Sequence, residues 1–169
     1  MRLFIAINFN KDTKSRLLAM RDDLKSKSAS GSFSSPENLH LTLVFLGECN
    51  AKEAAAIKSV MDAVSFEPFE IAIDRIGRFK RDDGDIWWAG VKENKALSEL
   101  QRGLSDRLIA AGFDLEKRKY SPHITLGRRV RTEESPGEIE PFGEEAASID
   151  LMLSERIEGR LTYSVLHHR

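Results

Sequence analysis

The sequence predicts an α+β protein whose strands pair in antiparallel fashion. Three segments repeat apolar residues at the spacing of a helix, whereas the others alternate or run continuously apolar, as strands do. The expected order is strand, helix, strand, helix, two strands, helix and three strands. Strands that follow one another directly pair most simply as antiparallel neighbours. A doubly wound parallel sheet, which needs a helix after nearly every strand, does not fit this order.

The first part of the chain predicts a strand, a helix and a second strand. Residues 3–9 are almost continuously apolar, which is typical of a buried strand, and the apolar residues of 17–24 fall at helical spacing. Residues 26–38 contain six serines, a glycine and a proline. We expect a loop there because these residues favour turns. The segment LHLTLVFLG at 39–47 is the second expected strand.

The middle of the chain predicts a β-hairpin between two helices. Residues 54–64 carry a helical apolar stripe, and residues 69–74 alternate apolar and polar side chains as a strand does. The turn Arg-Asp-Asp-Gly at 81–84 leads into a second strand, IWWAGV at 86–91. Leucines at helical spacing over 97–108 predict the last helix.

The last part of the chain predicts three strands and one loop. YSPHITLGRR at 120–129 is expected to be a strand, with its proline near the start, where a missing N–H is tolerated. Six of the thirteen residues at 133–145 are Glu, interrupted by two prolines and two glycines, and we expect a mobile, solvated loop. Two alternating segments at 147–153 and 160–167 complete the sheet structure.

The composition fits a single domain spanning residues 1–169, since one domain of this kind has roughly 150 residues. With 41% apolar and 31% charged residues and a net charge of −1, the chain is neither disordered nor a generally basic polyanion binder. A nucleic acid remains a possible partner where basic residues gather locally. The single Cys49 closes no internal disulfide, and no apolar run is long enough for a signal peptide or a membrane span. We therefore expect a cytoplasmic protein, without membrane attachment and monomeric by default.

The pattern His-apolar-Thr-Leu occurs twice, as HLTL at 40–43 and HITL at 123–126. The chain has only four histidines and five threonines, so a repeated pairing by chance is rare. In a strand, side chains two positions apart share a face, so His40 and Thr42 project together, as do His123 and Thr125. Two imidazoles can act as neutral base and protonated acid at one pH, and the hydroxyls can bind an anionic oxygen. This set suits in-line substitution at phosphorus.

The residues between and after these polar positions are expected to anchor each strand. Leu41, Leu43 and Phe45 would bury the opposite face of the first strand, and Ile124 and Leu126 that of the second. A duplicated structural pattern without a site is the competing interpretation, because duplication copies core residues as readily as functional ones.

The chain resembles the 2H phosphoesterases, which are named for two His-x-Thr-x motifs. It is most similar to the bacterial and archaeal RNA 2′,3′-cyclic phosphodiesterases, also known as 2′-5′ RNA ligases. RLFIAI resembles the first strand of that family, ENLHLTLVFLGE its first motif block and SPHITLGR its second, and the last two strands also match its pattern. The resemblance implies a bilobal, pseudo-twofold fold of two antiparallel sheets flanked by helices, with the catalytic groove between them.

The resemblance also implies the roles of the motif residues. His40 is the expected proton donor to the departing ribose 3′ oxygen, and His123 the expected proton acceptor from water. Thr42 and Thr125 are expected to hold the phosphate, and the product is a 2′-phosphate end. No metal and no cofactor are expected in this scheme. The implied partner is RNA with a 2′,3′-cyclic phosphate end, tRNA fragments among the candidates.

The family pattern has an arginine five residues after the second histidine, which is Arg128 here and is expected to bind phosphate. Strict alternation instead places Arg129 on the face of His123, unless the strand bends at Gly127. The sequence leaves this choice open.

Nucleobase contacts are expected from aromatic side chains near the motifs, because aromatic rings commonly stack on unpaired bases. Tyr120 and Phe45 are the first candidates, and one of Trp87 and Trp88 is another, since adjacent strand residues face opposite sides. Cys49 is expected to be a passive small side chain. His167 and His168 are interpreted as tail residues.

Three functions remain open on the sequence alone. The first is hydrolysis of RNA 2′,3′-cyclic phosphate ends, with reversible 2′-5′ ligation as an accompanying activity. The second is a sister specificity for cyclic nucleotides, ADP-ribose cyclic phosphate or 2′-5′ oligonucleotides. The third is a non-catalytic module that binds RNA ends, although binding alone would not require a paired acid and base.

Overall fold

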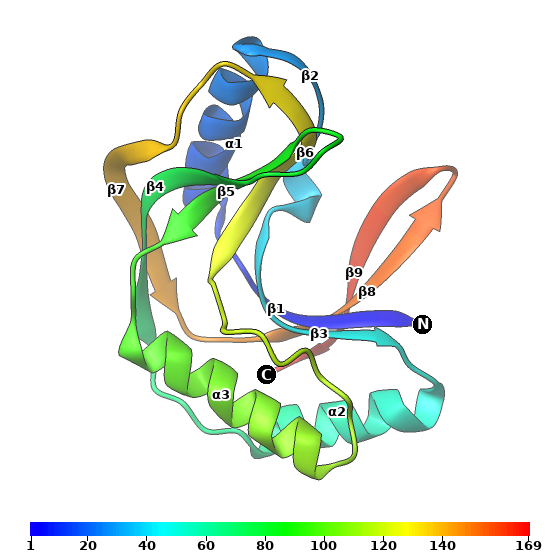
Figure 1. The fold of residues 1–169 in the computed structure, drawn as a ribbon. Coiled ribbons are helices and arrows are strands. Elements are labelled where there is room, and N and C mark those ends of the chain that lie inside the picture. The colour runs from blue at the N-terminus through cyan, green and yellow to red at the C-terminus, as the bar shows by residue number, and fades with distance from the viewer.

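The structure, a computed structural model that describes residues 1–169, contains two antiparallel sheets and three helices (Figure 1). The strands are β1 Arg2–Asn8, β2 Ser28–Phe33, β3 His40–Glu48, β4 Phe69–Phe79, β5 Asp85–Val91, β6 His123–Thr132, β7 Gly137–Ala146, β8 Asp150–Ile157 and β9 Arg160–His168. The helices are α1 Lys11–Ser26, α2 Ala51–Ala63 and α3 Lys95–Ala110, and a 3-10 turn, η1, covers Pro36–Asn38. The predicted α+β class and the antiparallel pairing are confirmed.

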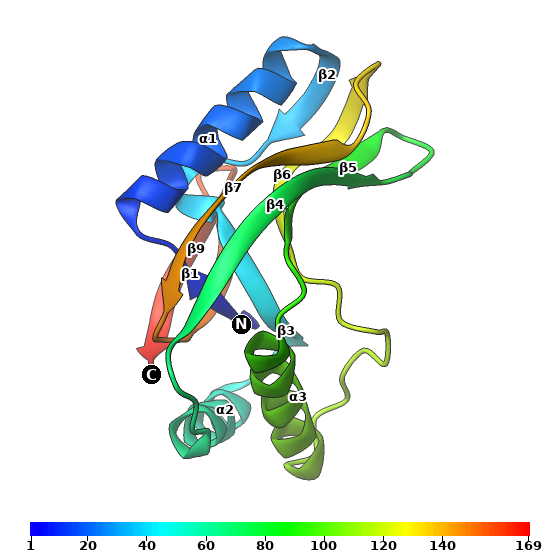
Figure 2. The ribbon, with the colours of Figure 1, turned by 90° about the vertical axis from the view of Figure 1, so that its left-hand side faces the viewer.

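Each sheet contains one of the two motif strands. The four-stranded sheet has the order β3-β1-β8-β9, and the five-stranded sheet has the order β2-β6-β5-β4-β7. Helix α1 packs beside β2, β6 and β7, whereas α2 and α3 lie below the four-stranded sheet (Figures 1 and 2). The chain therefore places HLTL in β3 and HITL in β6, in different sheets that meet near the middle of the molecule.

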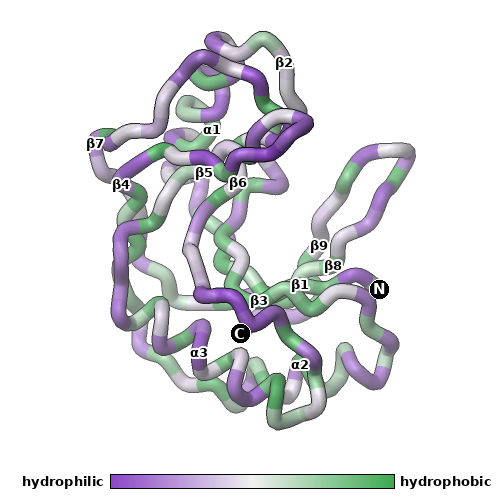
Figure 3. Tube along the Cα trace, in the orientation of Figure 1, coloured by the Kyte–Doolittle hydropathy of each residue, from purple (hydrophilic) through white to green (hydrophobic).

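One hydrophobic core of 29 buried residues joins the two sheets. It contains Ile5 and Leu41 from the four-stranded sheet, Ile73 and Ile124 from the five-stranded sheet, and Leu104 from α3. Truncating one such side chain to alanine costs about 2–5 kcal/mol of folding free energy. The strands with the longest hydrophobic runs lie at this centre, while hydrophilic residues gather at the β4–β5 turn and the neighbouring end of β6 (Figure 3).

Side-chain caps mark the starts of the helices. The Asn10 side chain accepts a hydrogen bond from the Thr13 amide at the start of α1. Asn50 and Glu53 form a reciprocal capping box at the start of α2. These contacts satisfy amides that would otherwise lack partners, typically for about 1 kcal/mol each. None of the helices is long and apolar enough to cross a membrane.

Two predicted loops are wrong, because both segments contain edge strands. Residues 28–33 form β2, which pairs with β6, although four of its six residues are exposed and none is buried. Residues 137–146 form β7, which pairs with β4 at the opposite edge. Backbone hydrogen bonds hold both strands in place without an apolar pattern, and the outer position of β7 tolerates Pro141, which lacks an N–H.

Candidate active site

The first half of the candidate site lies on β3. His40 and Thr42 project from one face, while Leu41 and Leu43 are buried in the core on the other. We call the face that carries the His and Thr the motif face of each sheet. His40 Nε2 lies 3.0 Å from Thr42 Oγ1.

Two aromatic rings enclose the His40 imidazole. The ring centroid of Phe4, on β1, lies 4.8 Å away, and that of Tyr163, on β9, lies 5.1 Å away in an edge arrangement. His40 Nδ1 is buried and has no hydrogen-bond partner. The imidazole therefore occupies an environment that disfavours its charged form.

The second half lies on β6 and has the same plan. His123 and Thr125 share the motif face, while Ile124 and Leu126 are fully buried behind them. His123 Nδ1 lies 2.7 Å from the Ser121 carbonyl oxygen, and since a carbonyl only accepts, Nδ1 donates. This leaves the lone pair of the neutral ring on Nε2.

Aromatic rings also flank the His123 imidazole. The Phe79 ring centroid lies 5.1 Å away and that of Trp88 lies 6.1 Å away. Trp88 is opposite Thr125 in the β5–β6 ladder, so it shares the motif face, whereas Trp87 is 1% exposed in the core. Of the two neighbouring tryptophans, Trp88 is the one beside the site.

Two observations place the halves together. The hydroxyl of Tyr120, which precedes β6, donates to the backbone carbonyl of Thr42 over 2.8 Å. The charge of His123 contributes to lowering the pKa of His40, and the charge of Arg128 acts on both histidines. The structure thus brings together His40, Thr42, His123, Thr125 and Arg128.

Burial lowers the pKa values of both histidines. For His40 it is the largest cause and lowers the pKa to about 4, and the positive charges of Lys14, Arg128 and His123 act in the same direction. The Asn38 backbone opposes this shift without reaching hydrogen-bond geometry at Nδ1. Burial also lowers the pKa of His123, opposed by the Ser121 carbonyl. Burial thus disfavours the charged form of both rings in the free protein, and an anion between them would favour protonation of one.

A β-bulge in β6 determines which of Arg128 and Arg129 lies on the same face as His123. Trp87 pairs with Gly127 and Trp88 with Thr125, so Leu126 is an extra residue in β6. The bulge shifts the alternation by one, which puts Arg128 on the motif face. Its charge lowers the pKa of both histidines.

Arg129 lies at a second irregularity of the same strand. Its φ is 53°, in the left-handed region that is uncommon for a side chain of this size. The backbone of Arg129 lies so close to Gly84 that a Cβ on Gly84 would come within 2.6 Å of it. The irregularity that the sequence suggested at Gly127 is therefore present, and it lies opposite Trp87 and Trp88 of β5.

The structure corrects the expected burial of Phe45. A register shift between β1 and β3, at Leu43, places Val44 in the core and leaves Phe45 50% exposed, opposite Phe4 on the motif face. The Arg2 guanidinium lies 5.2 Å from the Phe45 ring centroid. An exposed phenylalanine on this face is available for a nucleobase contact.

Tyr120 has a different surrounding from the one expected of a base-stacking residue. It packs against the hydrophobic core, and burial raises the pKa of its hydroxyl far above the usual range. The hydroxyl therefore remains a donor to Thr42 at any ordinary pH.

Sequence reasoning missed four further residues around the site, namely Phe4, Lys14, Phe79 and Tyr163. No local motif marks them, because each reaches its histidine through pairing or packing between distant segments. Lys14, at the end of the first turn of α1, has no ion-pair partner, and its charge acts on His40.

The remaining histidines and the cysteine lie elsewhere. His167 and His168 belong to β9 rather than to a tail, and they bind the carboxylates of Asp62 and Asp150 at 2.7 Å and 2.5 Å. Cys49 is buried. No group of three or more His, Cys, Asp or Glu side chains is arranged to hold a metal ion.

The family model described as LigT-like phosphoesterase matches residues 7–88 and 90–155 of this chain. The chain also superposes on the crystal structure of E. coli LigT complexed with 3′-AMP with a TM-score of 0.87. That match has 25% sequence identity and covers 99% of this chain and 96% of the other. Two sheets that each present one His-x-Thr motif thus define a phosphoesterase of the 2H class.

Sequence relatives agree with the family model. An RNA 2′,3′-cyclic phosphodiesterase of Archaeoglobus fulgidus is 32% identical over 151 residues, which cover 85% of each chain. One of Methanothermobacter thermautotrophicus is 36% identical over 131 residues, covering 76% of this chain and 71% of the relative. The chain belongs to the LigT-like phosphoesterase family.

Proposed function

We propose that this protein hydrolyses RNA 2′,3′-cyclic phosphodiester ends to 2′-phosphomonoesters. The observation that carries the proposal is the meeting of two His-x-Thr strands from different sheets, with Arg128 close to both histidines. The relatives named RNA 2′,3′-cyclic phosphodiesterase support the substrate class. The RNA end, tRNA fragments included, binds to a monomer in this proposal.

His123 acts as the general base. Its Nδ1 proton is held by the Ser121 carbonyl, so Nε2 carries the lone pair that removes a proton from water. The water oxygen attacks phosphorus, and the bond from phosphorus to the ribose 3′ oxygen breaks in line with the attack.

His40 acts as the general acid. Its Nε2 proton passes to the departing 3′ oxygen, which leaves as a hydroxyl, while the 2′ oxygen keeps the phosphate. Because the pKa of His40 is low, the protonated imidazole is a strong acid and gives up this proton readily. The negative charge of the substrate phosphate supplies the stabilisation that the free protein lacks.

Thr42, Thr125 and Arg128 hold the non-bridging phosphate oxygens. Two hydroxyl donors and a guanidinium stabilise the charge that develops on those oxygens in the transition state. General acid and general base catalysis contribute about 10²- to 10⁴-fold each. No step of this scheme is assigned to a metal ion or a cofactor. The same groups would form a 2′-5′ linkage if the 5′ hydroxyl of a second RNA took the place of water.

Product analysis with histidine variants tests the proposal. RNA ending in a 2′,3′-cyclic phosphate is incubated with the protein in excess chelator, beside 2′,3′-cyclic mononucleotides and 2′-5′ oligonucleotides. We expect a 2′-phosphate product from the RNA and loss of turnover in His40→Ala and His123→Ala. His167→Ala, which removes a histidine outside the site, is the matched control and should keep full activity.

Other outcomes would contradict specific parts of the scheme. Full turnover by either motif variant would exclude the two-histidine mechanism. Loss of activity in chelator would require a metal ion, and preference for 2′-5′ oligonucleotides would replace the substrate class.

A further inference from the structure

The strand β6 continues beyond the candidate active site with a row of polar side chains. After His123 and Thr125, the bulge at Leu126 brings Arg128 onto the motif face, and Val130 then packs in the core behind the sheet. Arg131, next in the alternation, returns to the motif face. The row therefore runs along one face from the reacting centre toward the far end of β6.

The neighbouring edge strand β2 adds hydroxyl groups to this row. Ser32 pairs with Arg128 and Ser30 with Arg131, and residues directly opposite in a ladder share a face. Both serines and both arginines are exposed. None of these four side chains forms an ion pair or a hydrogen bond within the protein. We call them the Arg–Ser strip.

Charge differs between the two sides of the five-stranded sheet, where β6 lies next to the edge strand β2 and β7 forms the other edge. Strand β6 carries three arginines and no carboxylate, whereas β7 carries four glutamates and no basic residue. A negatively charged chain that extends outward from the active site is attracted toward β6 and β2 and repelled by β7. The nearby carboxylate of Asp85 already accepts from the Arg81 amide and lies 3.7 Å from the Arg78 guanidinium.

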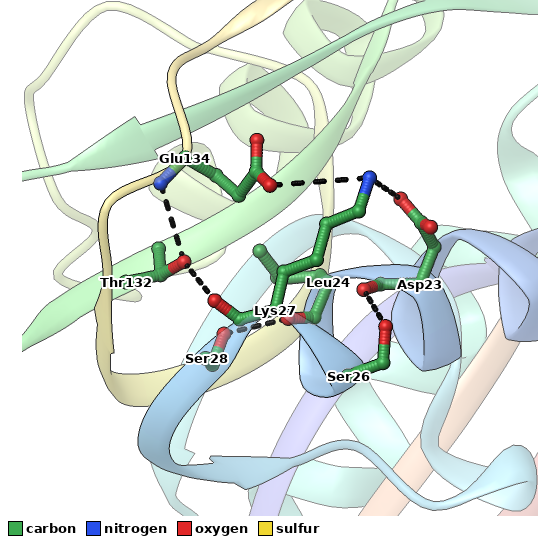
Figure 4. Close-up of polar contacts among 7 residues, drawn as sticks. All are labelled: Asp23, Leu24, Ser26, Lys27, Ser28, Thr132 and Glu134. Carbon is green, nitrogen blue, oxygen red and sulfur yellow. Dashed lines mark hydrogen bonds and ion pairs between the residues drawn. The ribbon is translucent and has the colours of Figure 1, made fainter.

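Beyond the far end of the strip, a lysine forms ion pairs with two carboxylates. Figure 4 shows Lys27 held between the carboxylates of Asp23, at 3.1 Å, and Glu134, at 3.9 Å. In the same network, the Thr132 hydroxyl donates to the Lys27 carbonyl over 2.8 Å. Lys27 is thus engaged within the protein. Arg131 is the last basic residue of β6, and it has no ion-pair partner.

We propose that the Arg–Ser strip binds the sugar-phosphate backbone of the RNA strand that leads into the reactive end. This inference rests on the proposed function, since the strip begins at the site of that reaction. A 2′,3′-cyclic phosphate is the last group of its strand, so the whole RNA lies on its 5′ side. Exposed arginines and serine hydroxyls are donors that contact phosphate oxygens without reading sequence.

The length of the strip sets the expected preference. Arg131 lies eight residues beyond His123, and because two of these residues are extra ones in bulges, this corresponds to about 20 Å of strand. The Arg–Ser strip is long enough to contact several nucleotides of one strand, whereas a mononucleotide in the active site is too short to reach Arg131. The enzyme therefore favours oligonucleotide ends of any sequence over 2′,3′-cyclic mononucleotides.

Kinetics with substrates of graded length test the strip. We expect kcat/KM to rise from a cyclic mononucleotide to a uniform RNA of about four nucleotides and to change little for longer ones. Arg131→Ala should lower kcat/KM for the four-nucleotide RNA about fivefold and leave the cyclic mononucleotide unchanged. Arg102→Ala, which removes an exposed arginine of α3, is the matched control and should change neither.

Salt dependence gives a second readout. A contact to one phosphate of a single strand contributes about −0.7 to the slope of log affinity against log salt. Arg131→Ala should remove about this much from the slope for the four-nucleotide RNA. Binding of a labelled four-nucleotide RNA with a 2′-phosphate end, followed by fluorescence anisotropy, measures that slope without any turnover.

The outcomes separate the two proposals. Equal kcat/KM for the mononucleotide and the four-nucleotide RNA, or identical behaviour of Arg131→Ala and Arg102→Ala, would overturn the strip and leave the proposed function intact. A wild-type protein that opens no cyclic phosphate would overturn the proposed function. In that case the anisotropy slopes of the two variants still decide whether the strip binds RNA.

Discussion

The two halves of the candidate site share one plan and differ in how each histidine is held. On β6, the Nδ1 proton of His123 is fixed by the Ser121 carbonyl at 2.7 Å. On β3, His40 Nδ1 is buried without a partner, and the pKa of that ring falls to about 4. A fixed Nδ1 proton suits a base, whereas a ring that is charged only when an anion is present suits an acid that acts after binding. The difference between the halves supports the two distinct roles that we propose for this nearly symmetric pair.

The largest expected effect is on kcat, and substrates with different leaving groups test whether the two histidines differ in role. His40→Ala and His123→Ala should each lose about 10³-fold or more in kcat on cyclic-phosphate RNA. On an aryl phosphodiester, whose phenolate leaves without protonation, the deficit of His40→Ala should shrink to about tenfold, because the acid is no longer needed. The His123→Ala deficit should persist. Equal deficits on both substrates would refute the division into acid and base.

The hydrogen bond that joins the halves gives a smaller effect. Tyr120→Phe keeps the buried ring and removes only the donor to the Thr42 carbonyl. We expect kcat to fall about tenfold with little change in KM, because the relative placement of acid and base is altered while phosphate binding is not.

A matched variant separates alignment from general stability. Thr132→Val removes another hydroxyl–carbonyl bond of 2.8 Å, from the far end of β6, and should leave kcat unchanged. In a His123→Ala background, Tyr120→Phe should cost nothing further, since there is no pair left to align. Additive losses would mean that Tyr120 supports the fold alone.

Protonation of the halves can be compared through pH profiles. We expect bell-shaped profiles for kcat/KM and kcat. Because burial lowers both histidine pKa values in the free protein, the kcat/KM profile should lie on the acidic side of the ordinary imidazole range. Bound phosphate raises both pKa values, so the kcat profile should lie at higher pH.

A variant of Arg128 should shift these pH profiles in a defined direction. Its charge lowers the pKa of both histidines, so Arg128→Gln should move the kcat/KM profile to higher pH. A rate that keeps rising through pH 9 would contradict control by the two histidines.

The smallest effect is on folding. The pKa of His40 is about 4 in the folded protein and 6.5 when unfolded, so the unfolded chain binds more protons between these values. Stability is lost as pH falls through this window. Between pH 7 and pH 5, the free energy of unfolding should drop by about 2 kcal/mol from this residue. In His40→Gln, denaturant titrations at the two pH values should show a correspondingly smaller drop, and an unchanged drop would contradict the burial of His40.

The sequence predicted the local parts of the site and not the parts made by distant pairing. Strand alternation alone places His40 with Thr42 and His123 with Thr125. Phe4 and Tyr163 flank His40 only because β1 and β9 come to lie near β3 in one sheet.

The same distinction explains the choice between Arg128 and Arg129, which the sequence left open, and the two wrongly predicted loops. Arg128 reaches the motif face through a bulge opposite Trp87 and Trp88, and no local pattern reports a bulge. Likewise, β2 and β7 are held by the ladders of β6 and β4, so their own side chains carry no strand signal.

The core shared by both sheets has a consequence for how the enzyme would meet its substrate. Ile5 and Leu41 of one sheet pack in the same close-packed cluster as Ile73 and Ile124 of the other, so the halves are not free to swing apart. The active site is then preformed, and substrate binding does not need the two sheets to close on each other. A preformed site of this kind fits the cyclic phosphate that we propose as substrate, because the atoms of that ring are already near their reacting positions, whereas a flexible linear diester would have to be bent into place.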